Sequence, residues 1–118
     1  MNVNQKIEAA LSSVVNNSIW PLCCPLESLP DEYITYLPEL ENPEEFADDE
    51  DIEWVPYMQV HWFKKSESGK PVNYLNAKKT IRKKLKESGF TITDIAAMHE
   101  KETGYTHLVF SCWIEEDD

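Results

Sequence analysis

The side chains that could carry chemistry in this sequence are three histidines, three cysteines and a large group of carboxylates. His61 and His107 fall in two segments of alternating polarity, so both can lie on the same face of a sheet. A two-histidine metal site is therefore geometrically possible, but no carboxylate or thiolate stands at a spacing typical of such a site. Half-exposed histidines on strands, His99 included, are the simpler interpretation.

The cysteines are Cys23, Cys24 and Cys112. An odd number with an adjacent pair is a poor framework for disulfides, and a zinc site would need CxxC-type spacing with further ligands. We expect reduced and mostly buried thiols, because free cysteine behaves as a small apolar side chain. No base and orienting group accompany any of them in a pattern typical of nucleophilic catalysis.

Other motifs with a known chemistry are lacking as well. Glycine occurs only at positions 69, 89 and 104, too few for a glycine-rich phosphate loop, and there is no serine nucleophile elbow. The clustered acids do not form a calcium-binding loop. We therefore expect a protein that is not an enzyme and that uses no cofactor and no metal.

Charge is distributed unevenly along the chain, whose formal net charge is −11. Nine of the eleven lysines and arginines lie between Lys64 and Lys86, and nine acids lie between Glu39 and Glu53. A net negative charge repels phosphate at long range, so we expect no specific nucleic-acid binding. The segment 38–53 is expected to be an acidic surface loop or an interaction arm.

The elements that position these residues follow from the periodicity of the sequence. Apolar residues at three- and four-residue spacing predict helices at 4–15 and 72–88, with Gly89 ending the second. The proline-bearing passage after the first helix is expected to be an irregular connection. Alternating or β-branched and aromatic segments predict four strands, at 32–37, 54–65, 91–100 and 105–114.

These elements predict one domain, 1–118, of the α+β class. Two helices on one face of a four-stranded, mainly antiparallel sheet give a two-layer sandwich in the order α-β-β-α-β-β. Apolar residues on both faces of strand 54–65 indicate that both faces can be covered, one of them by another subunit. No apolar run is long enough to cross a bilayer and the N-terminus does not resemble a signal peptide, so we expect a cytoplasmic protein with no membrane partner.

Six of the eleven basic residues lie on the helix 72–88. Three interpretations stay open. The helix presents a solvated amphipathic face over which the acidic loop of the same chain folds, or it contacts the acidic loop or the acidic tail of a neighbouring copy, which closes into a ring when the rotation allows. The third interpretation is a contact with phosphate, as in DNA that passes through a ring. Trp54 and Trp113 adjoin those acidic segments and are interface candidates, whereas Trp62 is a core candidate. The candidate subunit-interface residues are Lys78, Lys79, Arg82, Lys83, Lys86, Asp48, Asp49, Glu50, Asp51, Trp54 and Trp113.

The order and character of the elements resemble the small tail-completion proteins of long-tailed bacteriophages and prophages, also called tail terminators or head-tail joining proteins. The resemblance lies in the helix NQKIEAALSSVV, the passage NNSIWPLCCPLESLPDEYITY, the strand VPYMQVHWFKK, the helix NAKKTIRKKLKESGF and the hairpin TITDIAAMHEKETGYTHLVFSCWIEE. The acidic insert 38–53 departs from the simplest version of that pattern.

The resemblance implies a virion structural protein without catalytic residues. Such a protein forms an oligomeric ring, often a hexamer, that closes the tail tube, contacts tail-tube and neck or connector proteins, and surrounds the path of the DNA. It also implies assembly in the host cytoplasm and a final position at the tail-neck junction. An alternative from the residues alone is an acidic binding module that mimics DNA and regulates or inhibits a basic partner; a small enzyme is a third class.

Overall fold

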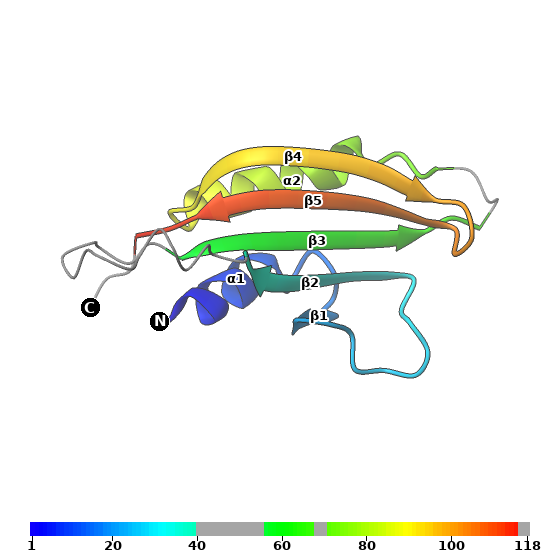
Figure 1. Ribbon diagram of the computed structural model, residues 1–118, viewed down its shortest axis with the longest axis horizontal. Coiled ribbons are helices and arrows are strands. Elements are labelled where there is room, and N and C mark those ends of the chain that lie inside the picture. Colours follow the sequence, from blue (N-terminus) through cyan, green and yellow to red (C-terminus); the bar gives the residue numbers. More distant parts are fainter. Residues whose placement is uncertain (40–55, 68–70, 116–118) are drawn as a thin grey trace, which may run out of the picture.

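The computed structural model of this chain describes residues 1–39, 56–67 and 71–115. Its centre is one five-stranded sheet with the strand order β1-β2-β3-β5-β4 (Figure 1). The first strand pairs in parallel with the second, and every other neighbouring pair is antiparallel. The strands are β1 (Ile19–Pro21), β2 (Glu32–Pro38), β3 (Tyr57–Lys65), β4 (Thr91–Glu100) and β5 (Tyr105–Trp113).

The predicted α+β class is confirmed, but the expected four-stranded, mainly antiparallel sheet is wrong in its count. The additional strand, β1, lies in the passage that was expected to be irregular. Its three residues run parallel to Ile34–Tyr36, and Ile19 is buried in the core. Pro21 is compatible with this strand because an edge strand needs hydrogen bonds on one side only.

The strand β3 is the central strand and has the alternation that its sequence predicts. Met58, Val60 and Trp62 are at most 2% exposed and face the core, whereas their neighbours along the strand face the other side. Pro56 precedes the strand directly, as expected, while residues 54 and 55 lie outside the described part of the chain. The hairpin of β4 and β5 also agrees with the sequence, with a turn at 101–104 in which Gly104 takes a φ of +80°.

The first helix, α1 (Val3–Leu11), begins with a capping box between Asn2 and Gln5. The prediction placed its end at residue 15, four residues too late. Ser12 donates a side-chain hydrogen bond to the carbonyl of Glu8, and residues 12–17 form turns rather than a further helical turn. Short polar side chains compete for backbone groups in this way, and Asn16 and Asn17 complete the stop with positive φ angles.

The second helix, α2 (Leu75–Glu87), is shorter than the predicted 72–88 but has the expected core face. Ile81 and Leu85 are fully buried, and Ala77 packs against the core from its edge. Gly89 follows the helix with a φ of +95°, which a glycine adopts without steric cost.

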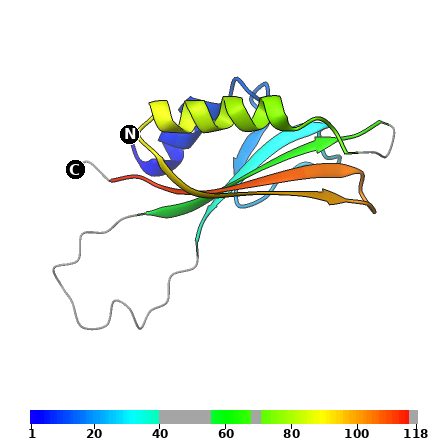
Figure 2. The ribbon, with the colours of Figure 1, turned by 90° about the horizontal axis from the view of Figure 1, so that it is seen from above.

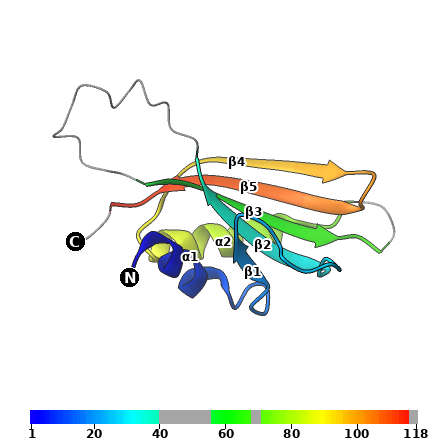
Figure 3. The same cartoon turned by 60° about the horizontal axis from the view of Figure 1, so that its bottom comes forward.

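Both helices cover the same face of the sheet, and the opposite face is left open by the described residues (Figures 2 and 3). The core therefore lies between one helical layer and one sheet layer, as predicted. Its members from the sheet are Ile34, Tyr36, Met58, Val60, Trp62, Leu108, Phe110 and Cys112.

Candidate functional site

Five of the six basic residues of α2 lie together on one side of the helix, because the helix buries the stripe around Ile81 and Leu85. We call this surface the basic face; Lys79, Arg82, Lys83 and Lys86 on it are exposed and Lys78 is half-buried. A shallow hollow of about 340 Å³ lies between the four exposed cations and Glu87. The predicted basic interface residues are thus brought together on one side of the molecule.

Few acids of the described chain neutralise this face. Within residues 1–39, 56–67 and 71–115, the ion pair found on it joins Lys83 to Glu87, with 3.9 Å between Nζ and Oε1. Both side chains are largely exposed, and a solvated i,i+4 pair of this kind contributes at most a few tenths of a kcal/mol, about 0.3–0.5. Within the described residues, most of the positive charge on this face therefore has no acid that neutralises it.

The basic face has a definite orientation relative to the sheet. On one flank of α2, Asn76 and Thr80 line a hollow together with Val14 and Trp62, so that flank faces β3 and the turn that follows the first helix. Arg82 lies two positions after Thr80, roughly on the other side of a helix with 3.6 residues per turn. Arg82 and Lys78 therefore lie on the flank that is turned towards β4.

The remaining predicted interface residues are not gathered on α2. Trp113 lies on the open face of the sheet, half-buried, with its ring 6.5 Å from that of Tyr57. Asp48, Asp49, Glu50, Asp51 and Trp54 lie outside the described residues, as does the end of the acidic tail. The expected contact between basic and acidic segments stays a prediction.

Two histidines on the open face form a contact that sequence reasoning predicted only in part. His61 and His107 were expected to share a face, and they do so as diagonal neighbours on β3 and β5. The Nδ1 atom of His61 lies 2.7 Å from Nε2 of His107, and Gln59 Oε1 lies 3.1 Å from the other ring nitrogen of His61. The direct bond depends on rotamers, which alternation along a strand does not specify.

The geometry of the pair is that of a hydrogen bond rather than of a chelate. The ring centroids of His61 and His107 are 4.9 Å apart and the facing nitrogens 2.7 Å apart, so these nitrogens lie close to the line between the ring centres. A metal needs lone pairs that converge on a point about 2.0–2.1 Å from each nitrogen. In the described part of the chain, no group of three or more potential ligands is clustered.

The environment keeps both imidazoles neutral near pH 7. Burial lowers the pKa of His61 to about 4, with a further contribution from the neighbouring His107. Burial also lowers the pKa of His107, partly opposed by the Glu100 carboxylate, whose Oε1 is 3.7 Å from Nδ1. Neutral rings can serve as one donor and one acceptor, which the short contact requires.

An aromatic stack continues from the histidine pair across the open face. Phe63 stacks on His107 with 4.1 Å between ring centroids, and Tyr33 stacks on Phe63 at 4.6 Å. Three neighbouring strands thus contribute one ring each, since Tyr33, Phe63 and His107 occupy the same row of the sheet. The stack shields His107, which is only 9% exposed although it lies on the uncovered face.

The cysteines differ from the expectation of mostly buried thiols. Cys112 is 1% exposed and belongs to the core, but Cys23 is exposed and Cys24 is half-buried. The latter two follow Pro21 and the left-handed residue Leu22 at the end of the edge strand, where the chain leaves the sheet. Burial raises the pKa of the Cys112 thiol to about 12, so that thiol is not a nucleophile in the folded protein.

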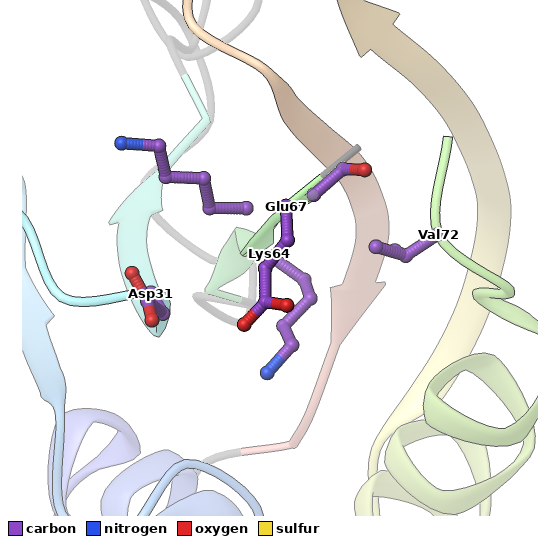
Figure 4. Close-up of a pocket in the computed structure, with 6 residues that line it drawn as sticks. Asp31, Lys64, Glu67 and Val72 are labelled. Atoms are coloured by element: carbon purple, nitrogen blue, oxygen red, sulfur yellow. The ribbon is translucent and has the colours of Figure 1, made fainter. Parts of the chain in front are cut away.

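A hollow of about 640 Å³ lies where β2 begins and β3 ends (Figure 4). Asp31, Lys64, Glu67 and Val72 reach it from different segments, and Lys65 and Ser66 complete its lining. Two carboxylates and two ammonium groups balance each other in charge. The lining of this hollow contains no histidine and no cysteine.

Comparisons with known proteins add no assignment: no protein-family model matches the chain, and a search of curated proteins gives no significant match. Among the described residues, neither helix has the length and apolar character that crossing a bilayer would require.

Proposed function

We propose that this chain is a non-enzymatic structural subunit that associates with copies of itself through the basic face of α2. The observation that carries the proposal is the group of four exposed cations on one helix of a chain with net charge −11. Surfaces of opposite sign at different places on one molecule produce head-to-tail contacts, which close into rings when the rotation between subunits allows. The acids between residues 39 and 53 supply the opposite sign.

The more specific form of the proposal is a ring that closes the tail tube of a bacteriophage or prophage and joins it to the neck. It is supported by the resemblance of the element order to tail-completion proteins and by the α+β fold with two helices on one sheet face. A ring with acidic inner surfaces would let DNA pass without binding it, because phosphate is repelled.

The proposal is tested by sedimentation velocity at about 50 mM and about 500 mM salt, since the Debye length falls from above 10 Å to a few Å over this range. We expect oligomers at low salt that dissociate at high salt, and closed rings with a central opening in negative-stain electron micrographs. A monomer at every salt and protein concentration contradicts the proposal.

Charge reversal locates the contact. The variant with Lys79→Glu, Arg82→Glu and Lys83→Glu should be monomeric yet folded. A matched control reverses Lys6, Lys65 and Lys101, which lie elsewhere on the molecule, and changes the net charge by the same amount. If both triple variants lose association equally, general repulsion and not the basic face is responsible.

A further inference from the structure

The two edges of the sheet are protected very differently. The edge strand β1 has three residues and ends at Pro21, whereas the opposite edge strand, β4, has ten residues, Thr91–Glu100. Its sequence TITDIAAMHE contains no proline and no lysine, the residues with which proteins commonly block an exposed edge. Ala96, Ala97 and Met98 in its middle are exposed.

The backbone on the outer side of β4 pairs with no strand in the part of the chain that the structure describes. A strand edge of this length presents a row of N–H and C=O groups that can accept a further strand. The register shift between Ile92 and Asp94 interrupts only its beginning. From Ile95 to Glu100 the ladder with β5 is regular, so the outer groups are regularly spaced as well.

The basic face adjoins this open edge. The helix α2 lies behind β4 and β5 in Figure 1, and it contacts β4 directly. Its flank with Lys78 and Arg82 is the one turned towards β4. The residues of β4 on the helical side of the sheet are Ile92, Ile95, Ala97 and His99, none of which is an acid. An incoming strand would therefore find hydrogen-bonding groups and positive charge side by side.

We propose that the β4 edge and the adjoining basic face together bind an extended acidic segment of a second copy of this chain, which adds to the sheet as a sixth strand. The inference rests on the proposed self-association and names the mode of contact. Charge complementarity selects the occupant, because one side of the added strand would face the cations of α2. In the stretch EEFADDEDIE, residues 44–53, an extended strand directs the acids at 45, 49, 51 and 53 to one side and those at 44, 48 and 50 to the other, so either side can face the cations.

The test uses a fluorescein-labelled peptide EEFADDEDIE and the full chain at about 50 mM salt, with anisotropy as the readout. Two further peptides carry N-methyl groups on alternate backbone nitrogens, one peptide at the odd-numbered and the other at the even-numbered positions. In an added strand the N–H groups of only one of these two sets point at β4. One methylated peptide should therefore lose at least about tenfold in affinity while the other binds as the parent does. Equal binding of all three peptides contradicts strand addition.

Two variants of the same helix test the flank. Arg82→Glu, on the β4 side, should weaken binding of the parent peptide about tenfold. Lys84→Glu is the matched control, because Lys84 lies four positions after Thr80 on the other flank, and it should change binding much less. Equal losses in both variants overturn the proposed place of contact.

The result is separable from that of the proposed function. If the copies associate in a salt-dependent manner but both methylated peptides bind as the parent does, strand addition at β4 is contradicted and self-association is still supported. If only one methylated peptide loses affinity but the protein stays monomeric at all concentrations, self-association is contradicted and β4 is still supported as a binding site for an acidic strand.

Discussion

His61 and His107 are joined head-on by a 2.7 Å contact between Nδ1 of the first and Nε2 of the second. One ring must donate and the other must accept, so the contact exists only while at least one of the facing nitrogens has no proton. The series of side-chain contacts continues from His61 to Gln59 and from His107 towards Glu100. Protonation of both rings would place two positive charges in contact, partly shielded from water by Phe63.

The first prediction is that folding stability decreases as the pH falls from about 6.5 to about 4. The pKa of His61 is lowered to about 4 in the folded protein, whereas the unfolded chain keeps the ordinary value near 6.5. The unfolded state therefore binds more protons in this window, so the free energy of unfolding rises with pH. Allowing for partial solvent screening, we expect a loss of about 1–2 kcal/mol, measured by urea denaturation at several pH values.

The control for this prediction is His61→Gln, which removes the titrating group but keeps a polar side chain. Carboxylates also titrate at the acid end, so the informative quantity is the difference in slope between the two proteins above pH 5. An NMR titration should place the midpoint of His61 well below 6. A midpoint near 6.5 with parallel slopes for both proteins would rule out the buried pair.

The second prediction concerns the buried stripe of α2. Ile81→Ala should lower the free energy of unfolding by about 2–4 kcal/mol, because it removes apolar atoms and leaves a cavity in the two-layer core. Thr80→Ala, at the neighbouring exposed position, should change it by less than about 0.5 kcal/mol. Chemical denaturation measures both, and equal small effects would show that α2 does not pack on the sheet as described.

The third prediction concerns Gly89, which ends α2 with a φ of +95°. A Cβ at this position would meet Ile114 at 3.5 Å, an ordinary contact, so the cost of Gly89→Ala is conformational rather than steric. We expect a loss of about 1–2 kcal/mol on alanine substitution and a smaller loss for Gly89→Asn, since asparagine tolerates a left-handed backbone better. Thermal unfolding of the two variants measures these losses. An equal loss of stability for Gly89→Ala and Gly89→Asn would argue against the positive φ at this position.

The fourth prediction is a graded reactivity of the three thiols. Cys23 is exposed and should react first with a thiol reagent, Cys24 should follow more slowly, and Cys112 should react only when the protein unfolds. The pKa of Cys112, raised to about 12 by burial, reinforces its protection because the thiolate is the reactive form. Mass spectrometry after timed labelling gives the order, with single Cys→Ser variants at 23 and 24 as controls. Rapid modification of Cys112 in the native protein would contradict the described core.

The local elements of this protein follow from its amino-acid sequence alone. The spacing of Ile7 and Leu11, and of Ile81 and Leu85, specifies amphipathic helices, and the alternation of Met58, Val60 and Trp62 specifies a strand with one buried face. These patterns are readable because each depends on neighbours within a few residues. The basic surface of α2 was also predictable, since the same periodicity that buries Ile81 exposes the lysines around it.

Which distant segments meet cannot be read from local patterns and depends on the fold as a whole. That Ile19–Pro21 forms an edge strand depends on Ile34–Tyr36 being free to pair with it, which no local pattern specifies. The bond between His61 and His107 likewise requires the register of two strands, 46 residues apart in sequence, and a particular pair of rotamers. The placement of the cations beside the open edge of β4 arises from the packing of α2 against the sheet. Periodicity in the sequence shows on which face of an element a residue lies. Which other element lies against that face depends on contacts between residues far apart in the sequence.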